Sequence, residues 1–368
     1  MVDQLKYQIA LTMVKGVGPL TARKLVSALG DVPSIFKTPL RQLEAIPGVG
    51  HTLALQIKED GLIARAEREL QFLDKVGGRL LFFSDADFPQ RLKECEDHPI
   101  LLYAKGKMNL NEQRVLGVVG TRKMTAYGRT QVEDILSDLR SKFPDLLVVS
   151  GLAYGVDGCA HRKSVELGLQ TVGVVGHGLD MIYPAEHRGL AERMMQKGGV
   201  LTEYHSHCLV NRKNFVSRNR IIAGVSDVIL VVESGEKGGA LLTAEFANSY
   251  NREVCAIPGR VNDVYSEGCN QLIKTNKAAM VECAQDIIDL MNWERNKEEK
   301  DPIQLSLFMD LSERERLVVQ ALEIEGKMQL NALSRKLQMP VGELSSILFE
   351  MEMKDLVVSE PGGVYGLR

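Results

Sequence analysis

Apolar and polar positions divide the middle of the chain into alternating segments. Short, largely apolar runs alternate with longer stretches of helical pattern. The apolar runs are typical of strands buried on both faces. They lie at residues 115–120, 146–151, 171–176, 200–204, 227–233, 253–259 and 278–282. The stretches between them predict helices near residues 126–140, 157–168, 186–197, 214–224, 240–250 and 284–291. Repeated β–α units of this length predict an α/β fold with a Rossmann-like, doubly wound and mostly parallel sheet.

The N-terminal part has a different pattern. Residues 1–68 predict short helices, and a Gly-Val-Gly turn at residues 16–18 is repeated at 48–50, each time before an amphipathic helix. Such glycines permit a tight turn and leave backbone N–H groups free for an anion. The repeat resembles the helix-hairpin-helix of DNA repair and recombination proteins. A small SAM-like helical bundle that uses the turns only for packing is the alternative. Strands are expected next, at 79–83 and 100–103.

The C-terminal part predicts a linker and a third domain. Residues 293–310 are charged and poor in apolar side chains, which is typical of a flexible linker. Ser312 and Glu315 then have the spacing of a capping box. Helices are expected near 313–324, 329–337 and 341–354, followed by a hairpin of 356–359 and 364–367. This order predicts a winged helix. Its second and third helices carry few cations, so protein contact and DNA binding both remain open. The expected domains are residues 1–68, 69–292, 293–310 and 311–368.

Composition restricts the class of protein. A chain of 368 residues with 45% hydrophobic and 25% charged residues is typical of a soluble protein with two or three domains. It contains no apolar run of membrane-spanning length and no signal peptide, so we expect a cytoplasmic protein without a membrane partner. The 6 cysteines include no C-x-x-C pair, which argues against disulfides and structural zinc. A net charge of -3 argues against indiscriminate coating of nucleic acid, but it leaves a local basic groove open.

Glycine turns follow several of the predicted strands. They lie at residues 120–122, 150–153, 176–178 and 235–239, with Arg122 and Lys237 among them. In doubly wound sheets the ligand crevice lies outside the carboxyl ends of the strands. Backbone N–H groups and helix dipoles at that edge favour an anion. The sequence has neither G-x-G-x-x-G after a strand nor a P-loop, so a nicotinamide or ATP cofactor is disfavoured and none is expected.

A basic segment precedes the strand at 227–233. Residues 211–220 read Asn-Arg-Lys-Asn-Phe-Val-Ser-Arg-Asn-Arg, and no carboxylate occurs between Glu203 and Asp227. Guanidinium groups suit phosphate, and an aromatic ring among them suits a nucleobase. The alternative is an amphipathic helix whose arginines pair with carboxylates. Arg218 and Arg220 cannot point the same way from one helix, so we expect one in the groove and the other paired with a carboxylate.

Together these motifs resemble the DprA/Smf family, the DNA-processing proteins of natural transformation. The resemblance rests on Val119-Gly-Thr-Arg-Lys-Met-Thr-Ala-Tyr-Gly128, Ser150-Gly-Leu-Ala-Tyr-Gly-Val-Asp-Gly-Cys-Ala-His161, Gly176-His-Gly-Leu-Asp-Met-Ile-Tyr-Pro184 and Asn214-Phe-Val-Ser-Arg-Asn-Arg-Ile-Ile-Ala-Gly224. It implies a non-enzymatic protein that binds single-stranded DNA, forms a homodimer through residues of about 260–290 in its Rossmann-like domain, and helps load RecA. The single-stranded DNA site that it implies comprises Arg122, Gly151, Arg212, Phe215, Arg218, Arg220 and Lys237. One departure is Val216, where the family usually has proline.

Other candidates for chemistry are weaker. Asp157 and His161 have the spacing of an acid–base pair on a helix, but support of the glycine turns is the preferred interpretation, because no nucleophile accompanies them. His205, His207 and Cys208 lack a distant second ligand pair for a metal. We therefore expect no catalytic residue and no metal site.

Two further resemblances remain as hypotheses. Gln304-Leu-Ser-Leu-Phe308 resembles the peptide by which bacterial replication proteins dock on the β sliding clamp, although it could instead pack on the winged helix. Residues 237–245 faintly resemble a loop of phosphoribohydrolases, so a nucleotide-processing enzyme is the alternative function. A pure adaptor that binds through its two end domains is a third.

Overall fold

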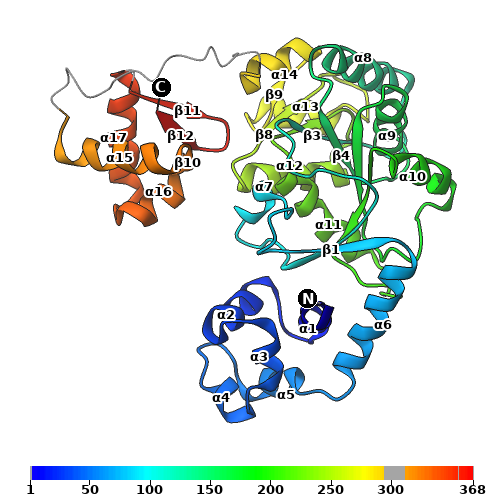
Figure 1. Ribbon diagram of the computed structural model, residues 1–368. Helices are drawn as coiled ribbons and strands as arrows, with labels where there is room; N and C mark the ends of the chain where they lie inside the picture. The colour runs from blue at the N-terminus through cyan, green and yellow to red at the C-terminus, as the bar shows by residue number, and fades with distance from the viewer. Residues whose placement is uncertain (1, 294–310, 355, 368) are drawn as a thin grey trace. The chain divides into compact units, whose positions relative to one another are not determined.

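The computed structural model describes residues 2–293, 311–354 and 356–367 (Figure 1). The expected linker, apart from Trp293, and the segment Gln304–Phe308 lie outside the described residues. The chain divides into two compact units, residues 1–250 with 254–284 and residues 251–253 with 285–368. None of the helices in the described ranges is both long and apolar enough to cross a bilayer.

A 9-stranded sheet organises the first unit, with the order β1-β2-β6-β5-β4-β3-β7-β8-β9. Its strands are β1 Gly78–Phe82, β2 Leu101–Lys105, β3 Val115–Val119, β4 Leu147–Ser150, β5 Gln170–Val174, β6 Gly198–Thr202, β7 Val228–Val231, β8 Glu253–Ala256 and β9 Ala279–Met280. From β3 the chain moves one way through β4 and β5 to β6, and the other way from β7 through β8 to β9. The doubly wound, mostly parallel sheet is therefore confirmed, and its strand order reverses beside β3. The β1–β2 and β2–β6 pairs, at one edge of the sheet, are antiparallel.

Helices cover both faces of the sheet, as right-handed crossovers on either side of a reversal require. One group follows β3, β4 and β5, and the other follows β6 and β7; members of each group contact one another (Figure 1). The first group is α8 Ala126–Lys142, α9 Val156–Glu166, η1 Ala185–His187 and α10 Arg188–Met194, and the second is α11 Arg212–Val225 and α12 Gly239–Ser249. Two short helices complete the first unit, α7 Gln90–Lys93 and α13 Glu267–Lys274, and α14 Ala284–Met291 lies at the division between the two units in the sequence. The apolar pattern did not predict α13, whose 8 residues span about two turns.

The glycine turns lie where the sequence predicts them. β3, β4 and β5 each end before the glycine that the apolar pattern had included in the strand, namely Gly120, Gly151 and Gly176. A strand buried on both faces ends where the backbone must turn toward a helix, and glycine permits that turn. These turns lie at the carboxyl edge of the sheet.

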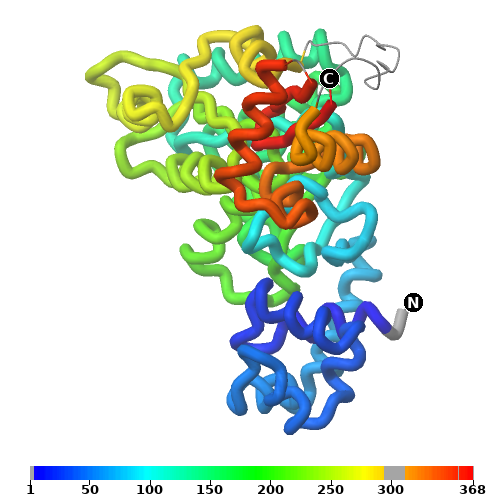
Figure 2. The backbone as a smooth tube through the Cα atoms, turned by 90° about the vertical axis from the view of Figure 1, so that its left-hand side faces the viewer, coloured from blue at the N-terminus to red at the C-terminus, as the bar shows by residue number. Residues whose placement is uncertain are grey.

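The N-terminal helices form a bundle, coloured blue in Figure 2. They are α1 Val2–Met13, α2 Pro19–Leu29, α3 Val32–Lys37, α4 Leu40–Glu44, α5 His51–Ile57 and α6 Leu62–Lys75. The two Gly-Val-Gly turns precede α2 and α5, as predicted. The expected domain boundary at residue 68 falls inside α6, because the apolar core of the bundle continues onto Phe82, Leu101 and Tyr103 of the sheet edge.

The second unit contains the predicted winged helix. It comprises α15 Glu313–Glu325, α16 Leu330–Leu337 and α17 Val341–Met353, together with a 3-stranded sheet of β10 Met328–Gln329, β12 Val364–Leu367 and β11 Val357–Glu360. The capping box is present, since the Glu315 backbone N–H donates to Ser312 and the Ser312 N–H donates to Glu315. Only the short strand β10 was not predicted.

Candidate functional site

A groove with a volume of about 810 Å³ opens at the carboxyl edge of the sheet, where the strand order reverses. Ligands of doubly wound sheets bind at this kind of position. Three segments line most of it: the turn after β3 (residues 119–123), the start of α11 with the residues before it (210–222), and the turn after β7 with the start of α12 (234–243). Ala153, Asp157 and Tyr183 complete the lining.

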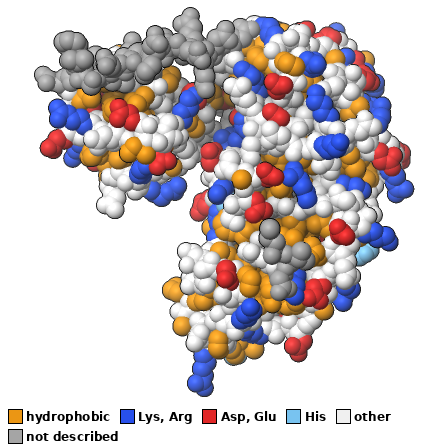
Figure 3. Space-filling view, viewed as in Figure 1, with side chains coloured by type: hydrophobic (Ala, Val, Ile, Leu, Met, Phe, Trp, Pro, Cys, Tyr) orange, Lys and Arg blue, Asp and Glu red, His pale blue; other side chains and the backbone are white. Residues whose placement is uncertain are grey.

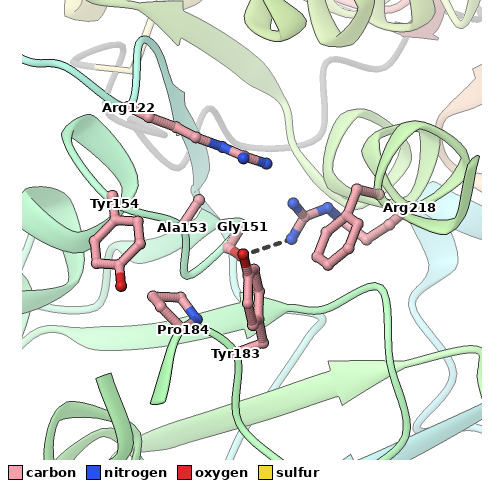
Figure 4. Close-up of a pocket in the computed structure, with 8 residues that line it drawn as sticks. Arg122, Gly151, Ala153, Tyr154, Tyr183, Pro184 and Arg218 are labelled. Atoms are coloured by element: carbon pink, nitrogen blue, oxygen red, sulfur yellow. Dashed lines mark hydrogen bonds between the residues drawn. The ribbon is translucent and has the colours of Figure 1, made fainter. Parts of the chain in front are cut away.

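The turn after β3 brings Arg122 and Lys123 to the groove and is held by Glu233. The Thr121 N–H donates to the Glu233 carbonyl over 2.7 Å, and the Thr125 N–H donates to the Glu233 carboxylate over 2.9 Å. The Thr125 hydroxyl donates to the same buried carboxylate. Glu233 therefore holds the backbone of the turn, while the Arg122 side chain extends into the site (Figure 4). No hydrogen bond or ion pair within the described residues engages the Arg122 guanidinium.

Arg218 approaches the same place from α11. It is only 4% exposed, and its guanidinium donates to the carbonyls of Gly151, over 2.7 Å, and Val174 (Figure 4). Burial lowers the pKa of Arg218 to about 10. The negative charge of Asp157 raises this pKa, and the positive charge of Arg122 lowers it. Arg218 is therefore charged at neutral pH. Because its positive charge is held next to that of Arg122, this end of the groove suits an anion.

Glycine is required at residue 151. A Cβ there would lie 2.5 Å from the Asp157 Oδ2 atom and 2.6 Å from the Arg218 Nη2 atom. Burial raises the pKa of Asp157, and the Arg218 charge opposes that rise. The Ala153 N–H faces the Asp157 carboxylate over 3.4 Å, so this acid supports the glycine turn, in agreement with the preferred interpretation of the sequence. Its helical neighbour His161 is fully buried, faces Thr171, and does not line the groove.

Aromatic side chains lie beside the cations. Phe215 lines the groove, and its ring centroid is 5.7 Å from that of Tyr183. A narrow notch at this end is lined by Tyr154, Pro184 and both rings, together with Arg122, Gly151, Ala153 and Arg218 (Figure 4). The sequence argument missed Lys123, Tyr154 and Tyr183 because it weighed only glycines and the densest basic segment. Each of the three lies within four residues of a strand-end glycine turn or directly before a proline, and that was the available signal.

The other predicted cations lie where α11 and α12 begin. Arg212 is the first residue of α11, after the cap formed by Asn211, and Lys237 lies in the turn before α12. Both line the groove. Gly238 caps α12 without a side-chain hydrogen bond, and no hydrogen bond within the described residues engages the N–H groups of Gly239 and Ala240, so these two are available to a ligand beside Lys237.

Arg220 does not line the groove, contrary to what the family resemblance implied. Its guanidinium pairs with Glu203 and donates to the Asp97 carbonyl over 2.8 Å. Arg218 and Arg220 differ by two residues and so leave α11 in different directions. The sequence expectation that one arginine would enter the groove and the other would pair with a carboxylate is thus met, with Arg220 as the paired one.

Within the described ranges, no group of three or more His, Cys, Asp or Glu side chains is arranged to hold an ion. His207 instead lies 3.4 Å from the Asp180 carboxylate.

Fold and site together define the class: a protein with a Rossmann-like domain that has a basic groove at the reversal of its sheet, preceded in the sequence by a helix-hairpin-helix domain and followed by a winged helix. The family model for DNA recombination-mediator protein A matches residues 79–292. The model for the DprA winged helix domain matches residues 309–363, and that for a SAM-like helix-hairpin-helix tandem matches residues 9–60. The chain belongs to the DNA recombination-mediator protein A family, also called DprA or Smf.

Individual relatives agree with this assignment. The chain is 35% identical over 299 residues to a putative DNA processing protein DprA of Mycobacterium tuberculosis, covering 78% of this chain and 76% of the relative. Its structure resembles that of DprA from Streptococcus pneumoniae, with a TM-score of 0.67, 30% identity, and coverage of 77% of this chain and 97% of the other. It also resembles DprA from Helicobacter pylori, studied for its single-stranded DNA binding mode, with a TM-score of 0.53, 25% identity, and coverage of 59% and 96%.

Proposed function

We propose that this chain binds single-stranded DNA along the groove, protects the incoming strand and helps load RecA onto it. The observation that carries the proposal is the set of cations that reach one groove from three separate segments: Arg122, Lys123, Arg212, Arg218 and Lys237. Asp157 is the only carboxylate among the described residues that line the groove, and it is buried beside Arg218.

Phosphates would lie on the exposed cations and on the N–H groups of Gly239 and Ala240 at the start of α12. Contacts of this kind carry no sequence information, so binding should be nearly independent of base sequence. Bases would stack on Phe215 and Tyr183, and each stacked base contributes about 1–3 kcal/mol. A strand with unpaired bases can use both kinds of contact, which is why we favour it over duplex DNA.

The proposal is tested by measuring the affinity for oligo-dT by fluorescence anisotropy as salt rises. We expect the logarithm of the binding constant to fall linearly with the logarithm of salt concentration, and Arg122→Ala to reduce the slope by about 0.7 because one phosphate contact is lost. Arg193→Ala is the matched control, since Arg193 is an exposed arginine on α10 outside the groove. Binding that does not respond to salt, or equal binding by both variants and the parent chain, would refute the proposal.

We propose further that the chain is a homodimer. Val261 and Val264 are strongly exposed, and Met280 lies exposed on the edge strand β9; all three fall in the segment of about 260–290 that the family resemblance indicates. Exposed apolar side chains on a sheet edge are typical of an interface. Sedimentation should show a dimer for the parent chain and a monomer for Val261→Asp/Val264→Asp, and the same mass for both would argue against this surface.

RecA loading is tested separately, by following RecA assembly on single-stranded DNA with and without the chain. We expect faster nucleation with the parent chain and no acceleration with Arg122→Ala.

The hypothesis that Gln304–Phe308 docks on the β sliding clamp is tested by whether Leu307→Ala/Phe308→Ala abolishes retention of the chain on the clamp.

A nucleotide-processing hydrolase is the alternative that residues 237–245 leave open. Cations from three segments exceed what one monophosphate needs, so the groove supports strand binding better. Release of free base from nucleoside monophosphates would favour the hydrolase.

A further inference from the structure

The helical wall of the groove carries exposed apolar side chains. Val210, Val216 and Leu242 all line the groove and remain 41%, 38% and 36% exposed. Val216 lies on α11 and Leu242 on α12, and these two helices pack against each other. We call Val210, Val216 and Leu242 the apolar step.

The spacing along α11 explains why the step faces the groove. The residues of this helix that line it include Arg212, Val216, Asn219 and Ile222, which recur every three or four positions and so share one face. Val216 stands in the middle of that face. The turn after β3 contributes Arg122 and Lys123 to the same groove, so a ligand there meets cations from that turn and, on the helices, apolar side chains beside further cations.

A strand and a duplex would use these two sides differently. A duplex presents phosphates outward but stacks its bases inside, so it can contact the cations and not the step. An unpaired strand can turn its phosphates toward Arg122 and Lys123 and lay the faces of its bases on the apolar side chains. Burying exposed apolar area on a base removes it from water, which is favourable.

We infer that the apolar step makes the groove selective for unpaired strands, with Val216 and Leu242 as specificity-determining residues. This inference rests on the proposed single-stranded DNA binding and assigns its selectivity to contacts other than the cations.

The test compares full-length parent chain with Val216→Gln/Leu242→Gln on three ligands of matched length, about 20 nucleotides or base pairs: oligo-dT, an abasic strand with the same phosphates, and a duplex. We expect the parent chain to prefer oligo-dT, and the variant to bind oligo-dT about five-fold to ten-fold more weakly while its binding to the abasic strand is unchanged. The preference for oligo-dT over duplex should fall by the same factor.

Two control variants accompany the test. Val216→Ile/Leu242→Met keeps the step apolar and should retain the parent affinity, which separates lost apolar contact from disturbed packing. Ile324→Gln/Met353→Gln changes side chains that are 77% and 75% exposed in the winged helix and should leave all three affinities unchanged.

The outcomes separate this inference from the proposed function. If the parent chain binds the abasic strand as tightly as oligo-dT, or if the glutamine variant weakens both equally, the apolar step has no role in selectivity and strand binding by the cations still stands. If the parent chain binds none of the three ligands, the proposed function fails as well.

Discussion

The groove and the winged helix both carry lysines and arginines, but most of those in the winged helix have carboxylate partners, whereas those exposed in the groove have none within the described residues. In the winged helix, four cations pair with glutamates, as Arg314–Glu343, Lys327–Glu360, Lys336–Glu325 and Lys354–Glu315. No ion pair within the described residues involves Arg122, Lys123, Arg212 or Lys237. Over the face shown in Figure 3, basic and acidic side chains are interspersed. The number of cations in a segment therefore says little; whether a carboxylate can reach them decides what they do.

The third helix of the winged helix strengthens the contrast. α17 contains no lysine or arginine, and it exposes Phe349 and Met353 one turn apart. A helix that entered the major groove of DNA would need cations or amides there. Of the two roles that the sequence leaves open for this domain, we therefore expect protein contact.

The largest effect should follow from Gly151→Ala, which breaks the groove and leaves the winged helix intact. The added Cβ would lie within 3 Å of both Asp157 and Arg218, so the guanidinium must move. We expect a loss of about 1–3 kcal/mol of stability, as for other overpacked sites, and a more than ten-fold loss of oligo-dT affinity. Thermal unfolding and anisotropy measure the two. Gly168→Ala is the control for a turn with open space around it, although its positive φ adds strain. Unchanged DNA binding by Gly151→Ala would show that Arg218 is not needed in the groove.

Glu233→Gln tests whether the Glu233 carboxylate beside the groove positions the backbone of a turn instead of neutralising a cation. Glu233 accepts from backbone and hydroxyl groups of the turn that carries Arg122, whereas the winged-helix glutamates neutralise side-chain cations. Hydrogen bonds to a charged group contribute about 1.5–3 kcal/mol, and glutamine can replace them only in part. We expect weaker oligo-dT binding with a non-additive double-mutant cycle against Arg122→Ala. Additive effects would mean that Glu233 supports the fold alone.

Lys123→Ala and Lys336→Ala compare an unpaired cation with a paired one. Lys123 has no carboxylate partner within the described residues, while Lys336 pairs with Glu325. Lys123→Ala should lower the salt slope of oligo-dT binding by about 0.7, and Lys336→Ala should leave it unchanged. If the two variants behave alike, carboxylate pairing does not distinguish the two regions.

The smallest expected effect is on the stability of the winged helix at acidic pH. The hydrogen bond from Lys354 and the Ser312 N–H lower the pKa of Glu315, so its contribution to stability is present at neutral pH and is lost as pH falls through that lowered value. Burial instead raises the pKa of Asp157, so the fold favours its protonation and acid does not remove stability through this group. Thermal unfolding from neutral to acidic pH should therefore show Glu315→Gln to be less acid-sensitive than the parent chain. Identical pH profiles would contradict the assignment.

Several features of the molecule follow from local sequence alone. Short, largely apolar runs determined the parallel strands, because a strand buried on both faces has no solvent-facing side on which polar residues would recur. Glycines after those runs located the carboxyl-edge turns, and the Ser312–Glu315 spacing located the start of α15. Arg122 and Lys237 were identified from their place in these turns, and Arg212 and Phe215 from the basic segment at residues 211–220.

Tertiary structure decided the rest. Arg218 reaches the groove because it bonds carbonyls 67 and 44 residues away, at Gly151 and Val174, and Arg220 is withdrawn by Glu203 from another strand end. Tyr183 enters the site from the segment after β5, and α6 crosses the expected domain boundary because its apolar face shares a core with β1 and β2. A local sequence pattern indicates which residues are buried and where the backbone turns. The partner of a long side chain depends instead on which strand ends the fold brings together.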